Sequence, residues 1–186
     1  WANVGASYAM HYDAASNEYF SSIYMGNQDR GTTAYSDQGA NVNTIDVDGT
    51  DVLRVCYAKR GMSAWSWFYY GRIKHRFNFT TDLPGEAVYD GLGNWWAAPI
   101  VESPDPTEDA IYAAYGSTLH KFTYQSSNNS VQHTTHPFNF QSAFGQELGV
   151  FGYSGLNRDL WYTALKNGTF VYSTDGGESW TKSNYV

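Results

Sequence analysis

The sequence is poor in cysteine and lacks long apolar runs, and each shortage excludes a class of protein. Cys56 is the one cysteine in 186 residues, so no disulfide can form within the chain. Disulfide-stapled scaffolds are therefore excluded. Cys56 lies in the apolar stretch DVLRVCYA, which favours a buried, unreactive thiol. No apolar run reaches the roughly 18 residues of a membrane helix, so we expect no membrane span.

Charge is scarce too, and positive charge most of all. Charged residues make up 16% of the chain, and 11 Lys and Arg stand against 18 Asp and Glu, giving a formal net charge of −7. Nucleic-acid-binding domains present a basic surface. The most basic stretch, GRIKHRF, is too short to form one, so we expect no nucleic-acid partner.

Aromatic residues and turn formers are abundant. Aromatics reach 18%, and there are 18 glycines. This composition favours short strands joined by tight turns, and no segment has a sustained helical period. Four related strands each begin at a glycine: GTTAYS at Gly31, GRIKHRF at Gly71, GSTLHKF at Gly116 and GTFVYS at Gly168. Successive copies are about 40 to 52 residues apart, which is typical of propeller blades.

The segments before each glycine complete a unit of four strands. YAMHYDAAS, NTIDVDGT, APIVESPDPTE and LGVFGYSGLN are interpreted as first strands, and DVLRVCYA as the second strand of the second unit. We therefore predict an all-β fold of four-stranded antiparallel propeller blades. The blades would cover roughly residues 5–45, 46–84, 97–135 and 147–186 in a single propeller region.

The second unit carries an apparent insertion, GMSAWSWFYYG, with five aromatic residues between Trp65 and Tyr70. It is interpreted as a core plug between blades. An exposed aromatic platform for a sugar or partner is the alternative.

Near the C-terminus, STDGGESW follows an aromatic strand. It resembles the Asp box (BNR motif) of sialidases, other glycoside hydrolases and sortilin-like receptors, through Ser173, Asp175, Gly177, Ser179 and Trp180. YSDQGANV is a degenerate echo that keeps Asp37 and Gly39. The Asp accepts hydrogen bonds from its own turn, and Gly supplies positive φ. The resemblance implies that the motif is structural, between the third and fourth strands and away from the catalytic face, and the turn chemistry agrees with a structural role.

The resemblance extends to YMGNQDRGTTAYSDQG and to the segment from Asn94 to Phe122. It implies a bacterial protein that is extracellular or on the cell surface, of a kind sometimes exported by type IX secretion. Such propellers have six to ten blades, so four blades predict part of a larger propeller. A closed four-blade ring is the alternative.

Two loops concentrate groups that suit recognition of protein or glycan. GNQDRG offers Gln28, Asp29 and Arg30, and DGLGNWW offers Trp95 and Trp96. The open alternative is that the polar groups hold their own turn and the tryptophans seal neighbouring blades. We predict a recognition or scaffold module, whose partners include further blades or chains.

The alternative function is part of a propeller glycoside hydrolase, sialidase-like or xyloglucanase-like. A sialidase needs three arginines, a tyrosine nucleophile and a paired Glu. Candidate arginines are Arg30, Arg54, Arg60, Arg72, Arg76 and Arg158, and candidate carboxylates for a glycosidase pair include Asp29, Asp51, Glu102 and Asp105. Their spacing identifies no catalytic residue.

No metal or cofactor is predicted. His133 and His136 of the HTTH stretch are interpreted as polar residues on the surface rather than metal ligands. DVDGTD, Asp46 to Asp51, looks like part of a calcium loop but lacks the remaining ligands. It is interpreted as a tight turn, with a weak Ca²⁺ site as the alternative.

Overall fold

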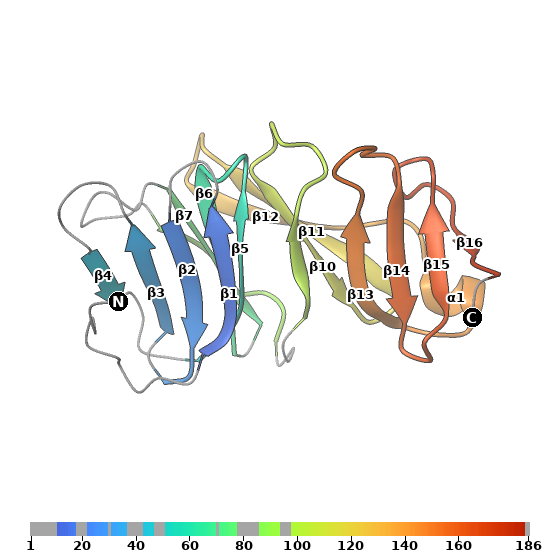
Figure 1. The fold of residues 1–186 in the computed structure, drawn as a ribbon, viewed down its shortest axis with the longest axis horizontal. Coiled ribbons are helices and arrows are strands. Elements are labelled where there is room, and N and C mark those ends of the chain that lie inside the picture. The colour runs from blue at the N-terminus through green and yellow to red at the C-terminus, as the bar shows by residue number, and fades with distance from the viewer. Residues whose placement is uncertain are drawn as a thin grey trace.

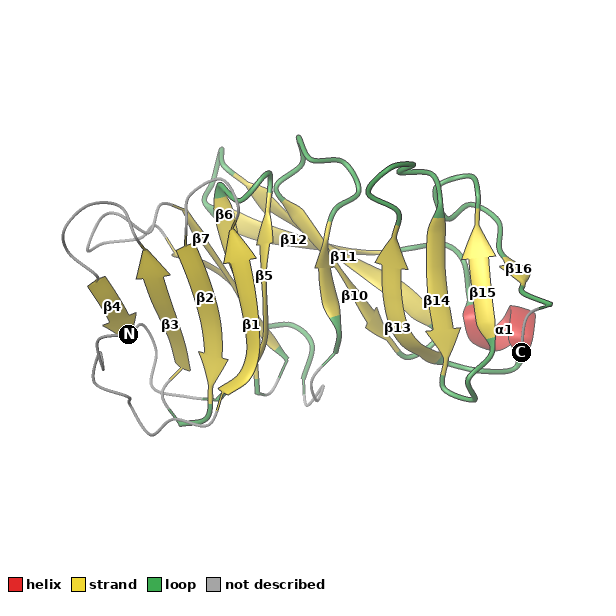
Figure 2. Cartoon of the chain, in the orientation of Figure 1, coloured by secondary structure: helices red, strands yellow, loops and turns green. Residues whose placement is uncertain are grey.

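The computed structural model describes residues 11–17, 22–29, 31–36, 43–46, 51–69, 71–77, 86–93 and 98–184. They form four separate four-stranded antiparallel sheets, each built from strands consecutive in sequence (Figures 1 and 2). This confirms the predicted all-β fold of propeller blades.

The sheets are numbered as blades 1 to 4 in chain order. Blade 1 contains β1 (His11–Asn17), β2 (Ser22–Asn27), β3 (Gly31–Ser36) and β4 (Asn43–Asp46). Blade 2 contains β5 (Val52–Ala58), β6 (Ser63–Phe68), β7 (Arg72–Phe77) and β8 (Glu86–Tyr89). Blade 3 contains β9 (Ile100–Glu102), β10 (Ala110–Tyr115), β11 (Thr118–Gln125) and β12 (Ser130–Thr135). Blade 4 contains β13 (Leu148–Tyr153), β14 (Trp161–Leu165), β15 (Phe170–Ser173) and β16 (Thr181–Lys182).

The four glycine-led segments all become third strands: β3, β7, β11 and β15. Their glycines have φ of 75°, 69°, 61° and 84°. A positive φ at this point suits the tight turn from the second strand, because glycine adopts it without steric cost. The sequence repeat therefore reflects a glycine that each blade needs in the turn before its third strand.

Two strand assignments in the second unit were wrong. NTID is β4, the last strand of blade 1, and DVLRVCYA is the first strand of blade 2 rather than its second. The apparent insertion contains β6, the true second strand. The Asp46–Asp51 turn signal thus falls between blades and not within one.

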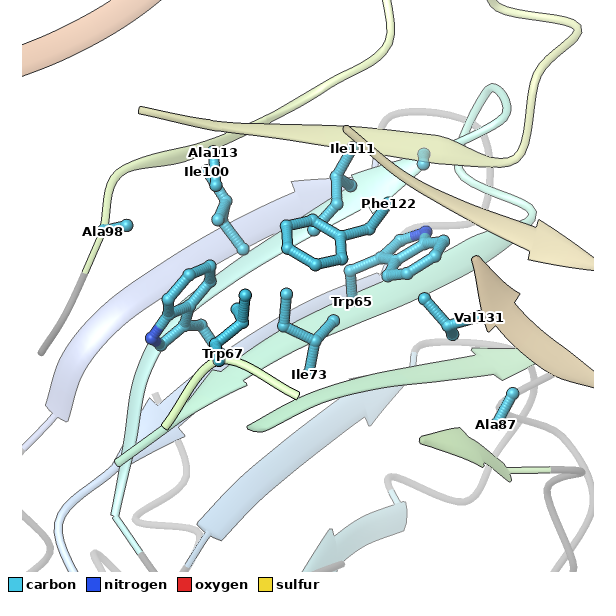
Figure 3. Close-up of a cluster of buried hydrophobic side chains, with 12 residues drawn as sticks. Trp65, Trp67, Ile73, Ala87, Ala98, Ile100, Ile111, Ala113, Phe122 and Val131 are labelled. Carbon is cyan, nitrogen blue, oxygen red and sulfur yellow. The ribbon is translucent and has the colours of Figure 1, made fainter. Parts of the chain in front are cut away.

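Strand β6 is buried on both faces, which explains the run of aromatics. Trp65 and Trp67 point toward blade 3 and are fully buried, whereas Ala64 and Phe68 point toward blade 1. Figure 3 shows the two tryptophans facing Ile111 and Phe122 of blade 3. The core interpretation is confirmed for Trp65, Trp67 and Phe68, which are buried and form no exposed platform, whereas Tyr69 after the strand is half-buried.

Each pair of consecutive blades shares one hydrophobic core. Tyr24 and Val52 lie in the core between blades 1 and 2, and Trp67 lies in the core between blades 2 and 3. Trp161 and Phe140 lie in the core between blades 3 and 4. Figure 1 shows the four blades as an open arc with blades 1 and 4 at its two ends.

One short helix, α1 (Phe140–Phe144), connects blades 3 and 4. Asn139 caps it by accepting a hydrogen bond from Ser142 N–H, and Gly145 ends it with φ 72°. The sequence analysis predicted no helix, and one of five residues is too short to produce a periodic signal.

The antiparallel order fixes where the loops lie. The described first–second and third–fourth connections, such as β5–β6 and β15–β16, lie at one edge of the arc, called edge 1. The described second–third and blade-to-blade connections, such as β10–β11 and β12–β13, lie at the other, called edge 2. The labelled arrows of β1, β5 and β13 point the same way, so this holds across the blades (Figure 1).

Candidate functional site

The first strands of the blades converge on an open cavity of about 800 Å³ on the channel side of the arc. All four blades contribute to it, through β1, β5, β9 and β13 and through three of their edge 1 loops. The first strands of consecutive blades contact one another, β1 with β5, β5 with β9 and β9 with β13, so they line the inner side of the arc. This volume is within the range of ordinary ligand sites.

Two arginines line the cavity from edge 1. Arg60 lies in the β5–β6 turn, and Arg158 lies in the β13–β14 loop. Both side chains are exposed. The β5–β6 turn is closed by a hydrogen bond from Met62 N–H to Lys59 O of 3.2 Å. Lys59, Arg60 and Gly61 have φ of 52°, 56° and 77°, a left-handed conformation that favours glycine.

A carboxylate and a phenol meet on the cavity wall. Tyr153 on β13 donates its hydroxyl hydrogen to Glu102 Oε1 on β9, at 3.1 Å. Burial, followed by the negative charge of Glu102, raises the pKa of Tyr153 far above its usual value. The hydroxyl therefore stays protonated and serves as a hydrogen-bond donor at neutral pH.

Cys56 also lines the cavity, and its side chain is half-buried where the sequence predicted a buried thiol. Burial, with the charges of Glu102 and Asp13, raises its thiol pKa well above the usual value. Because the thiolate is the reactive form, Cys56 is a poor nucleophile.

The Asp175 carboxylate organises the β15–β16 turn at edge 1. Asp175 Oδ1 accepts hydrogen bonds from Ser173 Oγ at 2.6 Å and from Ser179 N–H at 3.0 Å, and Oδ2 accepts one from Ser179 Oγ. Hydrogen bonds from Ser173 and Ser179 lower the Asp175 pKa to about 2. Asp175 is itself exposed, so its bonds act within the turn rather than in a core.

The same turn places Trp180 in the core between blades 3 and 4. Trp180 Nε1 donates to Gly177 O at 2.9 Å, and its ring meets Phe140 edge-on, with centroids 4.9 Å apart. Gly176 N–H donates to Asp159 O on the neighbouring edge 1 loop at 2.9 Å. The segment thus ties β16 to the blade core and to the loop that carries Arg158.

A buried polar cluster joins blades 2 and 3. The Asp109 carboxylate, just before β10, accepts hydrogen bonds from Ser63 Oγ at 2.6 Å and Trp65 Nε1 at 3.2 Å, and lies 3.0 Å from His75 Nε2. Burial raises the Asp109 pKa, but these hydrogen bonds outweigh it and the net shift is downward. Sequence reasoning missed this cluster because its residues are scattered over 46 positions.

The histidine interpretation also needs correction. His133 is half-buried rather than a surface residue, and its Nε2 lies 2.9 Å from His120 Nδ1. Tyr89 Oη lies 3.1 Å from His133 Nδ1, so these three residues link β8 of blade 2 to blade 3. Burial lowers the His133 pKa, which favours the neutral imidazole.

The described residues of the predicted recognition loops, 28–29 and 90–93, lie at edge 2, away from Arg60 and Arg158. Gln28 is half-buried, and Asp29 is exposed with φ 59°; its N–H donates to Asp51 Oδ1 at 2.6 Å. The remaining members of these loops, Arg30, Trp95 and Trp96, lie outside the described residues. Asp37 and Gly39 of the degenerate Asp box and residues 47–50 of the DVDGTD turn lie outside them too.

Within the described ranges, no three His, Cys, Asp or Glu side chains gather as metal ligands. The expected absence of a cofactor stays a prediction. None of the helices in the described part is long and apolar enough to cross a membrane.

The architecture is that of β-propeller blades, and comparison with solved structures gives the same fold. The chain is similar to Sqt1 from Saccharomyces cerevisiae, with a TM-score of 0.63 and 10% identity over 92% of this chain and 47% of that one. It is similar to Sqt1 from Chaetomium thermophilum, with a TM-score of 0.60 and 16% identity over 92% and 46%. The chain thus spans about half the length of either structure. No family model and no curated protein matches the sequence.

Proposed function

We propose that the chain is a β-propeller recognition module that binds a protein partner in the channel-side cavity. The observation that supports this most is the convergence of all four blades on one cavity of about 800 Å³. A site assembled from four sheets is held rigidly, because each blade is packed into a core with its neighbour. The fold alone does not specify a function, so the proposal rests on this site.

The proposal includes further blades that pack on the two ends of the arc. On blade 4, Val150 pairs with Ala164, which pairs with Phe170, so the three share one sheet face. That face is turned away from blade 3, and Val150 and Phe170 remain 47% and 43% exposed. Blade 1 exposes Ile23 by 41%. Apolar blade faces of this kind are normally covered in repeat proteins.

The secreted or cell-surface setting is also part of the proposal. It is supported by the Asp-box resemblance of the sequence. Surface biotinylation of intact source cells tests it: labelling of the native protein is expected, and labelling only after lysis would contradict it.

The binding proposal is tested by selecting short random peptides on the immobilised chain. Ser16 is exposed on β1 and lines the cavity, so Ser16→Trp fills the cavity without entering a core. Glu178→Trp, in the exposed β15–β16 turn, adds the same ring elsewhere. We expect peptides that bind the wild type and Glu178→Trp but not Ser16→Trp. Equal binding to all three proteins would contradict a cavity site.

One observation favours a second candidate function, glycoside hydrolysis. The Tyr153–Glu102 pair has the residue types of a nucleophile and its base. Tyr153 stays protonated, so attack on an anomeric carbon would require Glu102 to accept its proton. One feature argues against hydrolysis. The cavity arginines lie at edge 1 together with the Asp175 turn, whereas in the families that the motif resembles this turn lies on the opposite side from the catalytic residues. Release of fluorophore from an aryl sialoside by the wild type, lost in Tyr153→Phe, would support hydrolysis.

A further inference from the structure

We propose that Arg60 and Arg158 form an anion clamp at the edge 1 mouth of the cavity and that its ligand is an acidic peptide segment. This rests on the proposed function and adds the chemistry of the partner. The proposal is based on the position of the two guanidinium groups at the mouth of the cavity.

The two arginines differ from other cations of the described part. Arg72 pairs with Asp90 at 2.7 Å, and Lys121 pairs with Glu108 at the same distance. By contrast, within the described residues neither the Arg60 nor the Arg158 guanidinium has an ion pair or a hydrogen bond. A chain of net charge −7 thus leaves two guanidinium groups unpaired at one cavity.

The nearby carboxylates have other partners. Glu102 accepts the Tyr153 hydroxyl. Asp105, in the adjoining β9–β10 loop, accepts hydrogen bonds from Thr107 N–H at 2.8 Å and Thr107 Oγ1 at 2.7 Å. Hydrogen bonds from Thr107 lower the Asp105 pKa, and the nearby Arg158 charge adds to this, but within the described residues neither carboxylate forms an ion pair with Arg60 or Arg158. Both guanidinium groups therefore keep hydrogen-bond donors for a ligand.

The backbone at Arg60 gives a second, independent reason. Arg60 has φ 56°, which is strained for a non-glycine residue, and such strained residues cluster at functional sites. Gly61 follows at φ 77°, and the Arg60 side chain lines the cavity from this turn. An arginine kept in a strained turn at a cavity mouth indicates a binding role for its side chain.

The lining favours a peptide as the source of the negative charge. Arginine holds carboxylates through paired hydrogen bonds. Ile100, Val101 and Pro106 add aliphatic surface, which suits peptide side chains. Tyr57, Tyr153 and Tyr162 supply aromatic surface that either a peptide or a sugar could use, so the aliphatic residues are what favour a peptide.

The test uses short random peptides displayed against four proteins: wild type, Arg60→Gly, Arg158→Ala and Lys166→Ala. Arg60→Gly removes the side chain and suits the positive φ, so its melting temperature should equal or exceed that of the wild type. Lys166 pairs with Glu147 at edge 2, so Lys166→Ala removes one positive charge away from the cavity.

We expect peptides selected on the wild type to be enriched in Asp and Glu. Their affinity by fluorescence polarisation should fall at least about tenfold in Arg60→Gly and in Arg158→Ala, since each variant removes charge-assisted hydrogen bonds to the peptide carboxylates. It should be unchanged in Lys166→Ala and should weaken with added salt.

Three other results would overturn the clamp. Peptides that bind in the cavity without acidic enrichment would leave the proposed function standing and remove the clamp. Equal losses in all three variants would indicate general charge attraction. Binding of uronic-acid oligosaccharides, in a parallel array, with no peptide selected would assign the cavity to a glycan. No binding of either kind would contradict the proposed function itself.

Discussion

His75 Nε2 lies 3.0 Å from Asp109 Oδ2, and this contact joins the third strand of blade 2 to the start of the second strand of blade 3. His75 is fully buried, and Asp109 is 8% exposed. Ser63 and Trp65 donate to the same carboxylate, so one Asp satisfies three side chains of the neighbouring blade. The blades are thus held together by a polar cluster as well as by apolar packing.

Replacing Asp109 tests that cluster. Asp109→Asn keeps the shape but removes the charge that accepts the three hydrogen bonds, so we expect a loss of about 3 kcal/mol in unfolding free energy. Asp105→Asn is the matched control, because Asp105 is exposed and bonds only within its own turn. Its effect should stay within about 0.5 kcal/mol. Similar urea midpoints for the two variants would contradict the role given to Asp109.

Substituting two adjacent glycines, Gly176 and Gly177, tests the packing of the turn that contains Asp175. Gly176 and Gly177 have φ of 71° and 93°, but a Cβ on Gly177 would lie 2.6 Å from the Trp161 ring, whereas one on Gly176 would meet nothing closer than 3.8 Å. Gly176→Ala should cost about 1 kcal/mol through φ alone. Gly177→Ala should cost about 1–3 kcal/mol more through overpacking. Thermal unfolding measures both, and equal costs would refute the close packing on Trp161.

Acid stability tests the Asp175 carboxylate. Its folded pKa of about 2 lies below the unfolded value of about 3.9. Its contribution is therefore complete above the unfolded pKa and is lost as pH falls from about 4 to about 2. In Asp175→Asn this part of the pH dependence should vanish. A variant whose melting temperature falls as steeply as that of the wild type over this range would show that other groups cause the loss.

The covered and uncovered faces of the blades can be compared directly. Trp67 is fully buried between blades 2 and 3, so Trp67→Ala should cost about 3–5 kcal/mol. Phe170→Ala, on the outer face of blade 4, should cost about 0.5 kcal/mol or less in the isolated chain. A large cost for Phe170→Ala in urea denaturation would mean that another blade or chain covers this face in solution.

The sequence predicted strands correctly where a turn glycine repeats. It predicted them poorly where a strand is buried on both faces and shows no alternation of apolar and polar residues. Gly31, Gly71, Gly116 and Gly168 marked the third strands because each must adopt positive φ. Strand β6 was read as an insertion because a strand buried on both faces has no alternation of apolar and polar residues. NTID was assigned to the wrong blade because a strand pattern does not reveal the partner of the strand.

The candidate site was less predictable than the fold. Arg60, Glu102 and Arg158 were all identified as charged residues, but they are 42 and 56 positions apart in the chain, and only the arrangement of the blades brings them to one cavity. Tyr153 gave no signal, since its role depends on a hydrogen bond across two blades. The triple of positive-φ residues at Lys59–Gly61 was equally invisible, because neither Lys nor Arg is a turn former.

The most direct test of the account is hydrogen exchange of the wild-type chain with and without a peptide selected on it. Binding in the cavity predicts slower amide exchange in the edge 1 segments that carry Arg60, Glu102 and Arg158, with little change at Gln28 and Asp29 on edge 2. Slower exchange confined to the edge 2 loops, with none at Arg60 or Arg158, would contradict the claim that the channel-side cavity is the binding site.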